Sequence, residues 1–224
     1  MSGYYVDRLS AHRLRRVYEI APPRIRQYLD AEVSHVLERI RPGDTVLELG
    51  CGYGRAIPRL ASRAGLVIGI DTSPASLDLA QEMLGPISNC RLLNMDAVAL
   101  AFRDHAFDLV VCIQNGISAF HVDPKHLIGE SLRVTRPGGK VLLATYSDKF
   151  WEHRLKWFEI QSEAGLLGEL DLARTGNGVI ACKDGFTGRA FSRAQLLSLT
   201  TGFDAKTEIL EIDESSLFCE ILVR

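Results

Sequence analysis

Residues 45–55 read Thr-Val-Leu-Glu-Leu-Gly-Cys-Gly-Tyr-Gly-Arg, a short apolar run followed by a turn with glycine at every second position. Because glycine lacks a Cβ, such a turn adopts unusual backbone angles and lets a ligand lie against the main chain. A helical pattern follows over residues 56–61. The first turn of a helix offers free N–H groups and a positive dipole end to an anionic group. The segment therefore predicts a strand–loop–helix that binds a nucleotide-like ligand.

Length and composition indicate a soluble α/β protein. The chain has 224 residues, enough for one substantial domain or for a core with a small lid. Its hydrophobic content of 46% and charged content of 24% are ordinary for a globular protein. We find no apolar run of about 18 residues, and residues 1–30 lack the apolar centre of a signal peptide. We therefore expect a cytoplasmic protein without a membrane partner.

The net charge of −2 gives no global reason to expect a polyanionic partner, so we do not expect nucleic acid to bind. The basic cluster Arg13-Leu14-Arg15-Arg16 is the exception. It is typical of a solvated helix face, and a phosphate-binding patch is the alternative.

The cysteines are scattered without a CxxC pair, at Cys51, Cys90, Cys112, Cys182 and Cys219. Three of them lie in apolar, strand-like runs, where free cysteine packs as a small hydrophobic side chain. We therefore expect neither a disulfide framework nor a metal site.

Strand and helix patterns alternate after an N-terminal helical region that is interrupted at Pro22-Pro23. The expected strands cover residues 45–49, 66–70, 90–93, 107–113, 140–145, 206–212 and 216–223. Such alternation indicates parallel βαβ units, whereas the short link between the last two strands requires an antiparallel pair. We predict an α/β doubly wound, mostly parallel seven-stranded sheet with an antiparallel C-terminal strand and helices on both faces.

Residues 150–190 interrupt this alternation before the sixth strand, and they contain both tryptophans, Trp151 and Trp157. We interpret them as a lid or substrate insertion over the carboxyl edge of the sheet. The predicted single domain then has an N-terminal helical cap (1–41), a core (42–149 and 191–224) and this insertion.

The glycine spacing separates two families of nucleotide sites. A dinucleotide fingerprint is G-x-G-x-x-G, but Arg55 stands where that pattern requires its third glycine. A P-loop is excluded too, because no Gly-Lys-Ser/Thr follows the turn.

The chain resembles the class I S-adenosylmethionine-dependent methyltransferases in five elements that occur in the family's order. Residues 48–54 resemble the first motif, and Asp71 matches the acidic residue that holds the ribose hydroxyls. Residues 94–97 are similar to the adenine-contacting motif. Residues 107–111 resemble the opening of the fourth strand, and 136–139 the turn before the fifth.

This resemblance implies an enzyme that binds S-adenosylmethionine and transfers its methyl group by direct displacement. The cofactor-binding residues it implies are Glu48, Gly50, Cys51, Gly52, Gly54, Asp71, Thr72, Asp96, Ala97 and Gln114. The physical chemistry agrees, since a carboxylate at the end of a strand accepts strong hydrogen bonds from a ribose diol. Two alternatives stay open: Asp71 as a helix N-cap alone, and Asp96 as an acidic residue of a surface loop.

The loop at 114–121 should lie beside the methyl acceptor. It departs from the Asn/Asp-Pro-Pro-aromatic motif of amino-methylating relatives, which counts against nucleobase amino groups as substrates. We take His121 and Asn115 as the candidate catalytic residues, because histidine changes its charge near neutral pH. The alternative, in which His121 is a loop residue with no proton to move, stays open.

Aromatic residues of the cap and the insertion predict a small, partly apolar methyl acceptor. Tyr4, Tyr5 and Tyr18 are expected over the cofactor, and Trp151, Trp157 and Phe158 around the acceptor. An RNA or protein methyltransferase, a non-catalytic or non-methylating relative and a nicotinamide dehydrogenase are alternatives, and so is methylation of a metal or metalloid through Cys51, Cys182 and Cys219. Either a monomer or a homodimer fits the sequence.

Overall fold

Seven strands form one sheet in a computed structural model that describes residues 3–224, in the order β3-β2-β1-β4-β5-β9-β8. These strands are β1 (Thr45–Leu49), β2 (Leu66–Asp71), β3 (Cys90–Asn94), β4 (Phe107–Cys112), β5 (Thr135–Tyr146), β8 (Ala205–Ile212) and β9 (Ser216–Val223). β1 to β5 are parallel, and β9 runs antiparallel to both β5 and β8. The predicted fold class is therefore confirmed.

The strand order reverses direction between β1 and β4. The chain builds outward from β1 through β2 to β3 and then returns, so that β4 pairs with the opposite edge of β1. The two connections leave on different sides at this point and open a crevice at the carboxyl ends of the strands. The glycine turn after β1 and the loop after β4 meet there.

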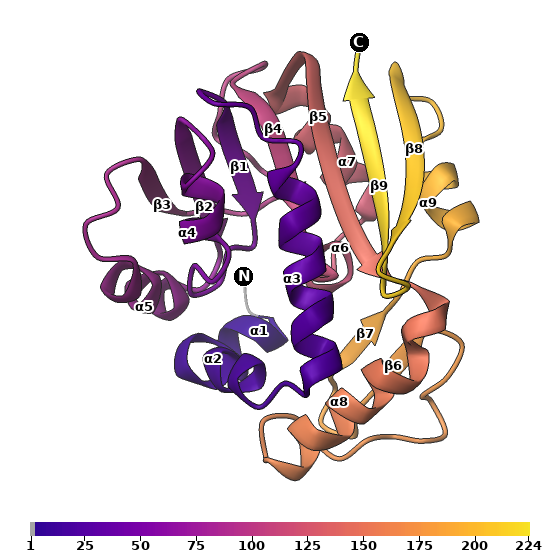
Figure 1. Cartoon of the computed structure of the whole chain (residues 1–224). Helices are drawn as coiled ribbons and strands as arrows, with labels where there is room; N and C mark the ends of the chain where they lie inside the picture. Colours follow the sequence, from indigo (N-terminus) through magenta and orange to yellow (C-terminus); the bar gives the residue numbers. More distant parts are fainter. Residues whose placement is uncertain (1–2) are drawn as a thin grey trace.

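Helices cover both faces of the sheet because successive side chains of each buried strand point to opposite sides. One face packs against α3 (Pro23–Leu37), α4 (Ile57–Ala61) and α5 (Pro74–Leu84). The other face packs against α6 (Gly116–Ala119), α7 (Pro124–Val134) and α9 (Arg193–Thr200). Figure 1 shows α3 lying across the near face of the sheet.

The N-terminal helical pattern divides into three helices, where the sequence predicts two. α1 (Tyr4–Asp7) and α2 (Ala11–Glu19) lie beyond the carboxyl ends of β1 and β2, whereas α3 packs on the sheet (Figure 1). The break occurs at Ala11, which has a φ of 47° and donates its N–H to Ser76 Oγ at 2.9 Å. This hydrogen bond to α5 takes the place of one that a continuous helix would make within itself. Because it joins residues that are distant in the sequence, hydrophobic periodicity does not reveal it.

The insertion forms a short helical turn η1 (Asp148–Phe150), then α8 (Trp151–Glu163) and a hairpin of β6 (Val179–Ala181) and β7 (Thr187–Arg189). It shares a third hydrophobic cluster with α1, α2 and the start of α3. Tyr4 Oη donates to Asp184 Oδ2 at 2.6 Å, and Arg13 Nη2 donates to the carbonyl oxygen of Gly165 at 2.8 Å. Cap and insertion therefore pack together as one cover at the carboxyl edge. None of the helices formed by residues 3–224 combines the length and the apolar character needed to cross a bilayer.

The predicted turn at residues 136–139 lies inside a longer strand. Pairing of β4 with β5 jumps from Phe107–Thr135 to Leu109–Lys140, and Gly138 has a φ of 78°. Asp108 fixes the irregular segment, since its carboxylate pairs with Arg136 Nε at 2.5 Å and accepts the N–H of Thr45 at 2.6 Å. β5 therefore begins earlier than the predicted strand 140–145.

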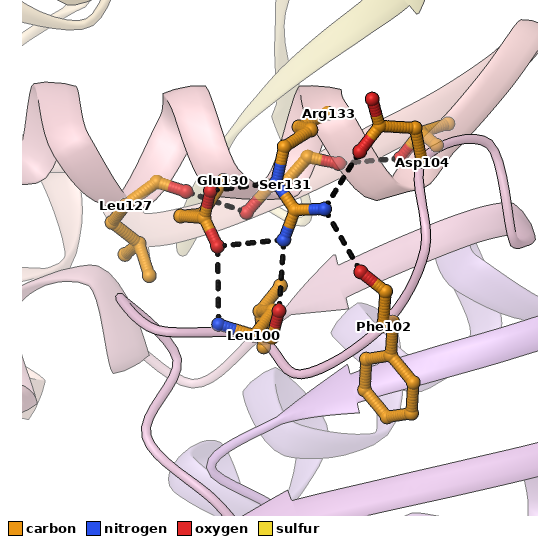
Figure 2. A network of polar contacts seen from close by, with 8 residues as sticks. Leu100, Phe102, Asp104, Leu127, Glu130, Ser131 and Arg133 are labelled. Carbon is orange, nitrogen blue, oxygen red and sulfur yellow. Dashed lines mark hydrogen bonds and ion pairs between the residues drawn. The ribbon is translucent and has the colours of Figure 1, made fainter.

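Arg133 on α7 anchors the loop that follows β3 (Figure 2). Its guanidinium donates to the carbonyl oxygens of Leu100 and Phe102 at 2.8 and 2.9 Å, and to Asp104 Oδ1 at 2.8 Å. It also makes two bonds of 2.8 Å with the carboxylate of Glu130, which in turn accepts the N–H of Leu100 at 3.0 Å. The arginine thus satisfies loop carbonyls that no secondary structure would pair.

We predict that Arg133→Met lowers the free energy of unfolding by about 2 kcal/mol, because charge-assisted bonds to the loop disappear while the side-chain stem remains. Urea denaturation followed by circular dichroism measures the change. Lys156→Met on α8 is the control, since this exposed lysine makes only an i,i+3 ion pair with Glu159. Equal losses in both variants would contradict the anchoring role.

Candidate active site

A cavity of about 320 Å³ opens at the carboxyl ends of β1, β2, β3 and β4, at the point where the strand order reverses. Most of the residues singled out in the sequence line it: Gly50, Gly52, Asp71, Thr72, Asp96, Ala97, Gln114 and His121. They come from four separate loops. The sheet therefore brings together residues that lie far apart in the sequence.

Each glycine of the turn is required for a different steric reason. Gly50, Gly52 and Gly54 have φ angles of 69°, 55° and 79°, a region that disfavours other residues. A Cβ on Gly50 would lie 2.5 Å from the ring of Phe120, and one on Gly52 would lie 3.0 Å from Leu14. At Gly54 it would meet α5 at 3.2 Å instead, so this glycine permits helix packing and does not line the cavity.

Asp71 connects the glycine turn to the next βα unit. One carboxylate oxygen accepts the N–H of Gly52 and the other accepts the N–H of Ser73, both at 2.8 Å. Burial raises the pKa of this carboxyl, and the backbone N–H groups oppose the shift. The N-cap of α5 is Ser73, whose hydroxyl accepts the N–H of Ser76, so Asp71 is not merely the helix cap.

The loop after β3 brings Asp96 and Ala97 to the cavity. Asp96 Oδ1 accepts the N–H of Val98 at 3.1 Å, which orders the turn locally. The Arg133 network in Figure 2 holds the continuation of this loop against α7. The carboxylate of Asp96 thus stands on a loop that is fixed at its far end.

Glu48 lies beneath the glycine turn and does not line the cavity. Its side chain is buried, and its Oε2 atom has no hydrogen-bond partner among residues 3–224. Burial raises its pKa to about 8, with the charge of Arg55 acting against the shift and that of Asp71 adding to it. Glu48 therefore supports the glycine turn from inside the protein, and its burial disfavours the charged form of its carboxyl.

The loop after β4 begins with two residues in the left-handed region, Gln114 and Asn115, with φ angles of 57° and 62°. Gln114 lines the cavity, whereas Asn115 does not. The Oδ1 atom of Asn115 accepts the hydroxyl of Thr145 at 2.8 Å, so its amide braces β5 and faces no acceptor. His121 lines the cavity at an exposed position. Only His121 of the two candidate catalytic residues therefore reaches the site.

Glu32 holds the loop after β4 from outside the cavity lining, a role that the sequence did not predict. It is fully buried on α3, and its carboxylate accepts the hydroxyl of Ser216 and, at 2.6 Å, the N–H of Gln114. Burial raises its pKa to about 7, and these donors oppose the shift. Its position was a readable signal, because an acidic residue interrupts the apolar stripe of Leu29, Val33 and Val36.

The cysteines are all buried free thiols. Cys51 lies outside the cavity lining, its N–H donates to the carbonyl of Ile70 at 2.9 Å, and burial raises its thiol pKa. Throughout residues 3–224, His, Cys, Asp and Glu side chains form no group of three or more that could hold a metal ion. The structure thus gives Cys51 a backbone contact in the turn.

Aromatic residues of the cap close the cavity. Tyr4, Tyr5 and Tyr18 line it, and the rings of Tyr18 and Trp157 lie 6.2 Å apart. Trp151 faces a separate hollow between α8 and α9. The cover over the glycine turn therefore comes from the N-terminal helices, with Trp157 behind it.

Comparison with known proteins agrees with this geometry. Residues 46–139 match a family model described as a methyltransferase domain. The chain is 32% identical over 149 residues to the 2-methyl-6-phytyl-1,4-hydroquinone methyltransferase of Synechocystis, covering 58% of this chain and 46% of that protein. It is 33% identical over 124 residues to phosphoethanolamine N-methyltransferase 2 of Caenorhabditis elegans, covering 52% and 27%. The chain thus spans less than half the length of these two relatives.

A crystal structure of a Pyrococcus horikoshii protein superposes with a TM-score of 0.68 at 19% identity and covers 99% of this chain and 98% of that one. This likeness concerns the fold. The family match implies S-adenosylmethionine as the ligand of the cavity, and the glycines and the Asp71 carboxylate on the cavity wall fit the adenosyl part of that molecule.

We predict that Asp71→Asn weakens binding of S-adenosylmethionine by roughly 10- to 100-fold, because the ionised acceptor of the ribose hydroxyls is lost at constant size. Isothermal titration calorimetry measures the affinity. Asp78→Asn, at an exposed position of α5, is the control and should leave the affinity unchanged. An unaltered dissociation constant for Asp71→Asn would refute the ribose assignment.

We predict a pH-dependent stability difference for Glu32→Gln. Since the folded chain holds the Glu32 proton up to a pKa of about 7 and the unfolded chain releases it near 4.5, native stability falls as pH rises through this window. The glutamine variant lacks this penalty, which amounts to about 3 kcal/mol above the folded pKa. Urea denaturation at pH 5 and pH 8 measures it, with the exposed Glu152→Gln as control. Parallel pH profiles of Glu32→Gln and the native chain would show the assignment to be wrong.

Proposed function

We propose that the chain methylates a small, partly apolar molecule, since residues 46–139 match a family model described as a methyltransferase domain. One observation carries the proposal: the glycine turn, Asp71 and Asp96 line a single cavity at the switch point of the sheet. The two curated relatives named above carry the names of methyltransferases for small molecules, which supports this substrate class.

When bound, S-adenosylmethionine supplies a methyl group on a positively charged sulfur, which keeps the bonding electron pair as the acceptor's lone pair forms the new bond to carbon. The chain's task is then to align the two reactants and exclude water, and alignment alone is worth roughly 7–11 kcal/mol. Gly50 and Gly52 allow the backbone to approach the ligand closely, and the rings of Phe120 and Tyr18 limit water. Asp71 is already oriented by two backbone N–H groups and keeps free lone pairs for a diol.

We assign to His121 the role of general base, the group that takes a proton from the methyl acceptor. It lines the cavity, and histidine is the residue type that exchanges protons near neutral pH. A base is needed only when the acceptor atom carries a proton that must leave. Asn115 takes no part in this proposal, because its amide bonds to Thr145.

The basic cluster on α2 does not support a polymer substrate. Arg13 donates to the carbonyl oxygens of Arg8, Gly165 and Leu166, and both Arg15 and Arg16 pair with Glu19. Each of these arginines thus has an intramolecular partner. We therefore propose a metabolite and not an RNA as the acceptor.

The test incubates the chain with methyl-labelled S-adenosylmethionine and either the low-molecular-mass fraction of a cell extract, total RNA or total protein. We expect label to enter the low-molecular-mass fraction. Gly50→Ala should reduce this labelling at least tenfold, since its Cβ would lie 2.5 Å from Phe120. Gly165→Ala is a matched control, because this glycine has a φ of 68° but open space around it. Label in RNA or protein alone, or in none, would overturn the proposal.

A further inference from the structure

A second, smaller cavity of about 40 Å³ lies behind the first, enclosed by α1, α2, α3 and α8. We call it the aromatic chamber, and its principal walls are Tyr5, Tyr18, Gln114, Tyr146, Trp157 and Gln161. Tyr5, Tyr18 and Gln114 also line the main cavity. The two spaces thus share a wall.

Two residues that line the chamber carry side-chain donors without a hydrogen-bond partner among residues 3–224. Trp157 and Gln161 are 4% and 2% exposed, and neither Trp157 Nε1 nor Gln161 Nε2 has a hydrogen-bond partner among residues 3–224. An indole N–H can only donate, so its missing partner must be an acceptor. The great majority of buried polar groups have a hydrogen-bond partner, so two donors without one on residues of the same cavity point to a ligand that supplies an acceptor.

The charges around the chamber disfavour a cationic ligand. Arg154 is 1% exposed, donates to the carbonyl oxygens of Gly178 and Gly188 at 2.8 Å, and forms no ion pair within residues 3–224. Its guanidinium lies 4.5 Å from the ring centre of Tyr146 and 5.7 Å from that of Phe158. A positive charge thus stands directly behind two rings that line the chamber.

The guanidinium of Arg55 likewise lies over an aromatic ring, 4.9 Å from the ring centre of Tyr18. Arginines therefore already interact with the rings that would otherwise attract an ammonium group. The buried carboxylate of Glu32 on α3 accepts hydrogen bonds from Ser216 and Gln114. It makes no hydrogen bond with Trp157 Nε1 or Gln161 Nε2. The chamber therefore offers a ligand neutral N–H donors with a positive charge nearby.

We propose that the aromatic chamber binds an oxygen atom of the methyl acceptor, so that the substrate is an aromatic or conjugated molecule with a carbonyl, phenol or carboxylate oxygen and not an amine. This inference rests on the proposed function. Trp157 and Gln161 donate to that oxygen while the rings hold the apolar body. An ammonium group can only donate hydrogen bonds, so it could not satisfy the N–H groups of Trp157 and Gln161. It would also place a second positive charge near Arg154.

Two probes of the same carbon skeleton test this: acetophenone, which carries a carbonyl oxygen, and 1-phenylethylamine, which is protonated at pH 7. Ligand-observed NMR measures their affinities for the full chain saturated with S-adenosylhomocysteine. We expect acetophenone to bind at least tenfold more tightly than 1-phenylethylamine. Equal or tighter binding of the amine, or no binding of acetophenone, would overturn the inference.

Trp157→Phe should weaken acetophenone binding roughly fivefold, as expected for the loss of one neutral hydrogen bond. Gln161→Met removes the second donor at similar volume and gives an independent reading if the tryptophan variant does not fold. Trp151→Phe is the matched control, because this tryptophan faces the other hollow. Unchanged acetophenone affinity in both donor variants would contradict the assignment.

Binding of S-adenosylhomocysteine separates this inference from the proposed function. The native chain and both donor variants should bind it with equal affinity. If the native chain fails to bind it, the proposed function fails. If it binds normally but the probes show no preference for oxygen, only the chamber assignment is wrong.

Discussion

The carboxylate of Asp71 connects the two strand–loop units on which the site is built. It stands at the end of β2 and accepts N–H groups from the turn after β1 and from the start of α5. Since both its oxygens are oriented by the backbone, the glycine turn cannot move independently of β2. The reversal of strand order beside β1 then leaves this carboxylate facing an open crevice. Asp71 therefore couples the glycine turn to the start of α5 through a side chain whose charged form burial disfavours and backbone donors stabilise.

Buried or half-buried polar groups recur around the crevice, and Glu32 and Arg133 each connect two elements of the fold. Glu32 joins α3 to the loop after β4 and to β9, and Arg133 joins α7 to the loop after β3. Such groups reduce stability when a partner is lost, but they define the positions of loops that have no regular hydrogen bonding. Glu48 and Trp157 differ from these, since each has a polar atom that finds no hydrogen-bond partner among residues 3–224. Fixed loops and orphaned atoms together describe a site that is preorganised for ligands.

The sequence predicted the sheet and many of the residues that line the cavity, because both follow from local patterns. Apolar runs, glycine spacing and acidic residues after strands locate the carboxyl edge, and Asp71, Asp96 and Gln114 indeed meet there. The remaining features arise from contacts between distant residues. Gly54 packs on α5, Asn115 bonds to Thr145, and the partner of Glu32 is 82 residues away. Periodicity carries no information about such pairs, although a charged residue in an apolar helix stripe was a signal of one.

A crystal structure of the chain with S-adenosylhomocysteine tests the central claim most directly. The account predicts the adenosyl group in the cavity at the carboxyl ends of β1 to β4, with both ribose hydroxyls within hydrogen-bond distance of the Asp71 carboxylate and the adenine beside Asp96. A ligand bound elsewhere, or a ribose that makes no contact with Asp71, would contradict it.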